Sequence, residues 1–412
     1  MTAPETSACD CNDTLDAQRL NTYCLCPQEP SPTPTGLQIA AVPVFLPSAD
    51  IERMSQLIGA IESVVHSDRW QRKVLATAPD IAQRKPGNAG VLYGYDFHLS
   101  ADGPKLIEIN TNAGGALIVA QVLRTQSGCC TDPAMAAPAC QAQQAEDAIV
   151  DSLLDDFAMA RGHREPRSIA IVDINPTAQY LYPEFLRFAE LLRARGFAVA
   201  IADPSELIAT NDGLILHGKP VDLIYNRLTD FYLEDESLAA LRRAYENDQV
   251  VVTPNPHHHA LYADKRHLAL LSDASALDAL HIDNITQGIL LNGIPQTRVV
   301  DAAHAKQLWA ERKTFFFKPA TAYGGKGAYR GAKLTRGTFE QLLHDDYVAQ
   351  REVEPTLRNA LVDGETIELK VDVRCYVYRG KIQLTAARLW RGQTTNFRTA
   401  GGGFATITRT AS

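Results

Sequence analysis

Two carboxylates and an amide in the first third of the chain have the spacing of a magnesium site. Asp96, Glu108 and Asn110 supply hard oxygen ligands, which Mg²⁺ prefers and supplements with phosphate oxygens. Glu108 and Asn110 are two residues apart, so on a strand they face the same side. Asp102-Gly103 is a strong hairpin signal, and a hairpin would fold Asp96 against the other two. We therefore predict a metal site here, with Mn²⁺ as an acceptable substitute and a plain polar strand face as the alternative.

A lysine and a glycine-rich segment lie far downstream of these ligands. Lys318 ends an apolar strand, where an ammonium needs an anionic partner because an unpaired buried charge is costly. The segment Gly324-Gly325-Lys326-Gly327 can bring backbone N–H groups close to phosphate oxygens. It is not a Walker A loop, because Ala328 stands where a hydroxyl residue would be required. The pattern predicts a phosphate site, against a plain hairpin turn as the simpler interpretation.

Taken in order, these segments resemble the ATP-grasp ligases. In that family the lysine and the glycine-rich loop precede the metal ligands, whereas in this chain they follow them. The inverted order resembles the circularly permuted branch that includes glutathionylspermidine synthetase and the eukaryotic-type glutathione synthetases. The resemblance covers roughly residues 85–115 and 165–412, and its specificity lies in the ordered set. It implies an ADP-forming enzyme that activates a carboxylate with ATP and joins it to an amine.

The resemblance also assigns residues to the nucleotide. Lys265 is similar to the first nucleotide lysine of the family, and a later strand resembles the adenine-binding hinge at Gln350, Glu352 and Val353. Arg374 and Arg388 place guanidinium groups on a sheet, where their planar forks suit phosphate oxygens, and we expect them to be catalytic.

Candidate substrate residues come from two places. Arg227 ends a strand and could grip a substrate carboxylate, with a surface ion pair as the alternative. Asn396 and Arg398 resemble the loop where these ligases approach their second substrate, with a surface arginine and a flexible tail as the alternative. One departure matters: Gly94 lies two residues before Asp96, where glutathionylspermidine synthetase-type enzymes carry an arginine. That particular substrate is therefore not expected.

The patterning predicts a fold of α+β and α/β parts. Apolar residues recur at helical spacing from Ile51 to Val65, and strands alternate with helices after residue 165, which predicts an open parallel sheet. Three consecutive histidines, His257 to His259, follow Pro254-Asn-Pro256 and predict a polar loop. We expect a circularly permuted ATP-grasp fold with a small open parallel-sheet substrate domain. Its parts are a flexible Cys-containing leader (1–35), a permuted segment with the metal ligands (36–160), the α/β substrate domain (165–250) and the nucleotide-binding region (251–412).

Composition limits the classes of function. A formal charge of −8 and a pI near 5.8 argue against a nucleic-acid scaffold. No apolar run reaches the roughly 20 residues of a membrane helix, and no signal-peptide pattern opens the chain, so we expect a cytoplasmic protein without a membrane partner. Two Cys-x-Cys pairs in the leader predict free thiols rather than a zinc site. The partners are a small acid and a small amine, and a homodimer is compatible with the sequence.

The function with the strongest support in the sequence is an ATP-dependent carboxylate-amine ligase that forms an amide bond through an acyl phosphate on an amino acid or small peptide. A kinase that stops at a phosphorylated product, and a non-catalytic ATP-binding protein, are the alternatives. The sequence does not separate ligase from kinase.

Overall fold

The structure is a computed structural model that describes residues 39–40, 43–128, 137–162, 164–321, 327–362, 365–396 and 399–410. Some of the residues predicted from the sequence lie outside these ranges. They are the phosphate-loop residues Gly324, Gly325 and Lys326, the substrate candidate Arg398 and the cysteine pairs of the leader. No described helix is long and apolar enough to cross a membrane.

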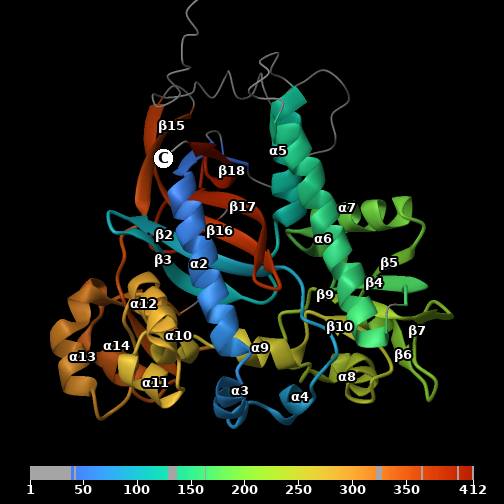
Figure 1. The fold of residues 1–412 in the computed structure, drawn as a ribbon, viewed down its shortest axis with the longest axis horizontal. Helices are drawn as coiled ribbons and strands as arrows, with labels where there is room; N and C mark the ends of the chain where they lie inside the picture. Colours follow the sequence, from blue (N-terminus) through green and yellow to red (C-terminus); the bar gives the residue numbers. More distant parts are fainter. Residues whose placement is uncertain are drawn as a thin grey trace, which may run out of the picture.

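A large sheet joins the two ends of the chain (Figure 1). Within the described residues it has seven strands in the order β1-β18-β17-β16-β2-β3, with β15 also paired to β16. The strands are β1 (Val44–Pro47), β2 (Tyr93–Ser100), β3 (Gly103–Asn110), β15 (Thr356–Val362), β16 (Glu365–Tyr378), β17 (Lys381–Trp390) and β18 (Gly403–Thr410). The antiparallel pairing of β16 with β2 sets Arg374 opposite Asp96, although the two residues are 278 positions apart.

The turns of this sheet follow from its glycines. The predicted hairpin between β2 and β3 is confirmed, with Gly103 at a φ of 97°. Arg379 and Gly380 connect β16 to β17 with φ angles of 49° and 72°, the left-handed pair that a two-residue hairpin requires.

The two faces of the large sheet are chemically different. Tyr95, Phe97 and Val373 point into a core covered by α2 (Ser48–Val65), whose predicted apolar stripe is buried. Because side chains alternate along a strand, Asp96 and Arg374 face the other way. The part of this face around Asp96 and Arg374 therefore forms the site, whereas Tyr376 and Phe404 on the same face belong to a second apolar core.

A smaller antiparallel sheet lies beside the large one. Its order is β11-β14-β12-β13, from β11 (Thr297–Val299), β12 (Phe315–Pro319), β13 (Tyr329–Arg330) and β14 (Tyr347–Arg351). Helices α13 (Ala305–Glu311) and α14 (Arg336–Leu342) close its own core around Phe315, Phe317 and Phe339. Helices α10 (Arg266–Leu271), α11 (Ala274–Ala279) and α12 (Asn284–Gly293) precede it in the chain.

The predicted parallel sheet is present in the α/β unit. Its order is β10-β9-β4-β5, from β4 (Ser168–Val172), β5 (Ala198–Ala202), β9 (Leu223–Asn226) and β10 (Val251–Thr253). The sheet extends past residue 250 because β10 pairs with β9. In Figure 1 this unit, with α7 (Tyr182–Ala194) and α8 (Ala239–Glu246), lies at the right, and helices α10 to α14 lie at the lower left.

The turn at His217-Gly218 folds β7 (Leu214–Leu216) and β8 (Lys219–Val221) into a separate antiparallel sheet with β6 (Leu207–Ala209). One local expectation was wrong. The histidines do not form a polar loop, because they lie in α9 (Pro256–Tyr262), which begins at an Asn255 N-cap with proline in its first turn.

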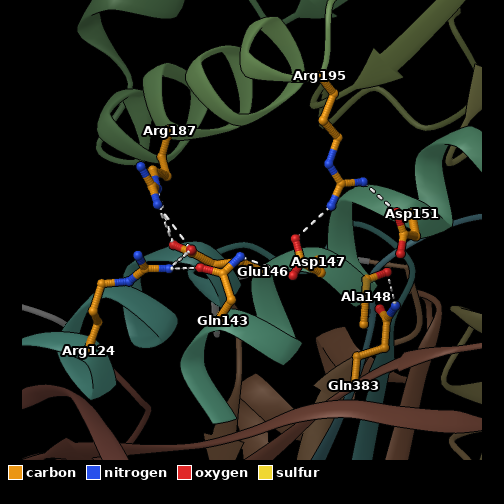
Figure 2. Close-up of polar contacts among 9 residues, drawn as sticks. All are labelled: Arg124, Gln143, Glu146, Asp147, Ala148, Asp151, Arg187, Arg195 and Gln383. Atoms are coloured by element: carbon orange, nitrogen blue, oxygen red, sulfur yellow. Dashed lines mark hydrogen bonds and ion pairs between the residues drawn. The ribbon is translucent and has the colours of Figure 1, made fainter. Parts of the chain in front are cut away.

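A buried carboxylate joins the α/β unit to the helices beside the large sheet (Figure 2). Glu146 of α6 (Ala137–Arg161) is fully buried and receives three hydrogen bonds from Arg187 of α7, at 2.8, 3.0 and 3.1 Å. It also pairs with Arg124 of α5 (Ala116–Gly128). Further along α6, Gln383 of β17 donates to the Ala148 carbonyl oxygen at 2.8 Å. The network therefore links α5, α6, α7 and the large sheet.

We predict that Glu146→Ala strongly destabilises the protein. Removing the carboxylate leaves the mostly buried Arg187 without its main counter-charge, which typically costs about 3–5 kcal/mol. Urea unfolding followed by circular dichroism measures the loss. Asp147→Ala is the matched control, because its pair with Arg195 is half exposed and should contribute no more than about 1 kcal/mol. Equal losses in the two variants would contradict the assignment of a structural role to Glu146.

Candidate functional site

A cavity of about 880 Å³ lies where the large sheet, the β11–β14 sheet and the α/β unit meet. The predicted site residues that line it come from all three parts: Asp96, Glu108, Asn110, Arg227, Lys265, Lys318, Gln350, Glu352, Val353, Arg374 and Arg388. Chain segments that are far apart in sequence therefore contribute to a single chamber.

Two arginines hold Asp96 at the floor of this cavity. Arg374 grips it with both ends of its fork, from Nε to Oδ1 at 2.6 Å and from Nη2 to Oδ2 at 2.7 Å. The Nη2 atom of Arg388 lies 2.9 Å from Oδ2, and Arg388 also donates to Asp372 at 2.7 Å. The side chains of these two arginines and of Asp96 and Asp372 are at least nine-tenths buried, so solvent screens these ion pairs little.

Glu108 lies next to Asp96 across the β2–β3 hairpin and is strongly acidic. Burial alone would raise the pKa of Glu108, but Lys265 and Lys318 outweigh it and lower the pKa to about 2. Lys265 Nζ lies 3.7 Å from Glu108 Oε2. Glu108 is therefore an anion at any physiological pH, as a metal ligand must be.

Asn110 completes the predicted ligand set. Its amide nitrogen donates to Asp96 at 3.1 Å and to Glu108 at 3.3 Å, so its oxygen points elsewhere in this amide orientation. No group of three or more His, Cys, Asp or Glu side chains that could hold a metal occurs among the described residues. Two carboxylates and an amide nevertheless fit Mg²⁺, which is commonly held by one or two carboxylates together with substrate phosphates.

Lys318 projects from β12 toward the same ligands. Its ammonium donates to Gln350 Oε1 at 2.8 Å and to the carbonyl oxygen of Ile107, the neighbour of Glu108, at 3.3 Å. Burial lowers the pKa of Lys318 to about 8, although Glu108 opposes the shift. Its two hydrogen-bond partners are neutral, so the cation can still interact favourably with an anionic ligand.

The residues that the family resemblance assigns to an adenine hinge lie at the edge of the cavity. Gln350 is buried, and its Nε2 has no hydrogen-bond partner among the described residues, which leaves a donor for a ligand. Glu352 pairs with Arg330 at 2.8 Å, and the Val353 carbonyl oxygen lies 2.7 Å from His98 Nδ1. Burial lowers the pKa of His98.

Two other predicted residues do not line the cavity. Asn396 donates to the Arg391 carbonyl oxygen at 2.7 Å and accepts from Thr399, so its side chain stabilises its own loop. Gly327, at a φ of 69°, accepts from the Tyr347 hydroxyl at 2.9 Å and adjoins the cavity only through Ala328.

The α/β unit contributes Arg227 and a carboxylate that the sequence analysis did not select. Arg227 is 6% exposed, donates to Asn112, and keeps an Nε without a partner among the described residues. Asp173 also lines the cavity, because it follows β4, the strand paired with β9. Burial raises the pKa of Asp173 to about 6, although Arg227 opposes the shift. A position just beyond a parallel strand was the available signal for Asp173.

Gly94 leaves room for Arg374. A Cβ built on Gly94 would lie 2.6 Å from Ala113 Cβ and 3.1 Å from Arg374 Nε, closer than side chains pack. A side chain at position 94 is therefore incompatible with the observed Arg374 position. The guanidinium beside Asp96 comes from β16 instead of from the strand that carries Asp96.

The fold is that of a glutathione synthetase-like protein. The glutathione synthetase-like effector GSS30 from Globodera pallida, solved without ligand, covers 95% of this chain and 95% of its own, with a TM-score of 0.60 at 11% identity. A putative gamma-glutamylcysteine synthetase from Methylobacillus flagellatus KT covers 88% and 87% at a TM-score of 0.45 and 12% identity. The ATP-grasp ligase PsnB, in complex with a minimal precursor, Mg and ADP, covers 58% of this chain and 88% of its own at a TM-score of 0.31 and 17% identity. No protein-family model and no curated protein matches the sequence.

Gly94→Ala should displace Arg374 from Asp96 while the chain stays folded, and we predict that it lowers the expected ATP turnover at least tenfold. The added methyl group meets Arg374 and Ala113, and the arginine can move more easily than the backbone. Steady-state ADP release and circular dichroism measure the two effects. Gly59→Ala, in α2 with no atom within 4 Å of the new Cβ, is the control and should keep full turnover. Wild-type turnover in Gly94→Ala would show that Arg374 need not lie against Asp96.

Proposed function

We propose that this protein is an ATP-dependent, ADP-forming ligase that joins a carboxylate to an amine through an acyl phosphate. The observation that carries the proposal is one cavity in which buried Asp96 and partly exposed Glu108 and Asn110 face Lys265, Lys318, Arg374 and Arg388. Oxygen ligands beside a group of fixed cations suit a metal-bound polyphosphate. The shared fold with a glutathione synthetase-like protein supports this choice.

In this proposal the order of the segments reflects a circularly permuted ATP-grasp fold. The hairpin of β2 and β3 comes early in the chain, but its strand β2 pairs with β16, next to the last strands. That pairing is what a permutation would produce, since it keeps the sheet while it moves the point where the chain begins.

Each group of residues in the cavity would have a distinct role in binding Mg-ATP. Glu108, Asn110 and Asp96 would hold Mg²⁺, which when bound shields the charge of the phosphates. Lys265 and Lys318 would neutralise the nucleotide, and Gln350, Glu352 and Val353 would contact its base. Catalysis of phosphoryl transfer is mostly positioning and charge stabilisation, so no side-chain nucleophile is needed.

The reaction would proceed in two transfers. A carboxylate oxygen of the acid forms a bond to the γ-phosphorus of ATP as the bond to the bridging oxygen breaks, which releases ADP. Arg374 and Arg388, already oriented by Asp96 and Asp372, would stabilise the acyl phosphate. The amine nitrogen then attacks the acyl carbon, phosphate leaves with the C–O bond electrons, and the nitrogen loses a proton.

The acid would bind toward the α/β unit. Arg227 has a buried guanidinium with an unused Nε donor, which suits a carboxylate other than the one activated. Asp173 supplies an anion on the same wall, which suits an ammonium. An α-amino acid end carries both groups, so we infer an amino acid or a small peptide as the acid.

Transfer of ¹⁸O tests the reaction directly. With an acid labelled in its carboxylate, we expect one ¹⁸O in the released phosphate for each amide formed, since the acyl oxygen leaves with phosphorus. Mass spectrometry of phosphate and product measures both, and Glu108→Gln should abolish them. Unlabelled phosphate with amide formed would exclude an acyl phosphate. A stable phosphorylated product without amide would favour the kinase alternative, and bound nucleotide without turnover would favour a binding protein.

Replacing Arg227 should weaken binding of the acid alone. We expect Arg227→Gln to reduce affinity for the acid by about 1.5–3 kcal/mol, because a charge-assisted bidentate contact is lost. Affinity for ATP should stay within twofold, because Lys265, Lys318 and Gln350 make the nucleotide contacts. Calorimetric titration of each ligand separates the two. Equal losses for both ligands would contradict the placement of the acid.

The pH dependence should identify Asp173 as the partner of an ammonium. With the pKa of Asp173 raised to about 6, the anionic form predominates above pH 6 and disappears below it. Affinity for an amine-bearing acid should therefore be constant from pH 7 to 8 and decrease toward tenfold per unit below pH 6. Asp173→Asn should flatten this profile, as should an acid without the amino group. A wild-type slope in Asp173→Asn would refute the assignment.

A further inference from the structure

Trp390 lines the same cavity with an unused hydrogen-bond donor. It ends β17, two residues after Arg388, and only 3% of its surface is exposed. Its indole Nε1 is buried and has no partner among the described residues. The indole N–H can only donate, and a buried donor left unpaired costs about 1–3 kcal/mol. A ligand acceptor would remove that cost.

The residues around Trp390 are also donors. Lys370 is its cross-strand neighbour on β16, with Nζ 4.9 Å from the centre of the indole ring. That ammonium donates to the Gly392 carbonyl oxygen at 2.5 Å, which leaves it two further N–H groups. Lys333 and Arg330 line the same part of the cavity.

The charges near Lys370 are only partly balanced. Arg330 pairs with Glu352 at 2.8 Å and with Glu354 at 2.9 Å, so the acidic residues near it already have a partner. Burial is the main cause that lowers the pKa of Lys370, and the positive charges of Arg330 and Lys333 lower it further. The negative charges of Glu352 and Glu354 oppose this shift. This end of the cavity therefore favours an anion.

The subsite is separate from the predicted phosphate and metal contacts. Lys318 and Gln350 lie on the smaller sheet, and Glu108 lies on β3 at the far edge of the large sheet. Lys370 and Trp390 lie on β16 and β17, and Lys370 is four residues from Arg374, roughly 13 Å along the strand. The loop that begins after Trp390 is the one that the sequence analysis associated with the second substrate.

We propose that Trp390 and Lys370 form a subsite for an anionic group, a carboxylate or a phosphate, carried by the amine substrate. The identity of the ligand as the amine substrate rests on the proposed ligase function, whereas binding of an anion at Trp390 does not. In this arrangement the amine enters over the loop after β17 with its anion fixed by Trp390 and Lys370. The acid enters from the α/β unit, so the two substrates meet between Arg388 and Arg374.

Indole resonances of the full chain test this subsite without turnover. The protein has three tryptophans, so ¹⁵N-indole labelling gives three signals, and Trp390→Phe assigns the one of interest. We expect inorganic phosphate to shift the Trp390 signal saturably, and Lys370→Met to weaken that response at least tenfold. Lys381→Met, which removes an exposed lysine at the other end of β17 from Trp390, should leave it unchanged. The Trp70 signal should not move, since its N–H already donates to Leu261 at 3.2 Å.

A second titration tests whether the anion at Trp390 belongs to the amine substrate or to the nucleotide. With saturating Mg-ADP present, we expect the phosphate response of Trp390 to persist, because the nucleotide binds elsewhere in the cavity. Loss of the response would assign the anion to the nucleotide and overturn the proposal, as would phosphate binding that leaves Trp390 unmoved. A persistent response in a protein that forms no amide would retain the anion subsite and reject the ligase function.

Discussion

The grip of Arg374 and Arg388 on Asp96 is the interaction on which the site depends. Three strands must pair in one order before these side chains can meet, and the strands come from opposite ends of the chain. Breaking such a buried pair from one side would leave an uncompensated charge. The ion pair is therefore compatible with a single register of β2 against β16, and that register also places Glu108 and Asn110.

The same packing also shifts the pKa values of the charged residues in the site. Glu108 stays ionised because Lys265 and Lys318 offset its burial, and the pKa of Lys318 is lowered because burial outweighs the attraction of Glu108. Such a balance is costly in the folded protein, since each buried ion must be paired. Shifted pKa values of this kind concentrate at functional sites, which agrees with a site that receives a charged ligand.

Much of this arrangement could be predicted from sequence, and the remainder depends on long-range packing. The β2–β3 hairpin, the α2 stripe and the parallel sheet have local signals, namely an Asp-Gly turn, helical spacing and alternation of strands with helices. The contact of Arg374 with Gly94 has no local signal, because it arises only when β16 pairs with β2. Trp390 was not selected, because a tryptophan at a strand end usually indicates only a core position. The histidines were misassigned because their burial comes from packing of α9.

We propose that a metal-bound nucleotide occupies the cavity between the two antiparallel sheets. A crystal structure with a non-hydrolysable ATP analogue and Mg²⁺ tests this proposal most directly. We expect the metal on oxygens of Asp96, Glu108 and Asn110, the phosphates within hydrogen-bond distance of Lys265 and Lys318, and Arg374 still in contact with Asp96. A nucleotide bound outside this cavity, or one whose metal ion contacts neither Glu108 nor Asn110, would contradict it.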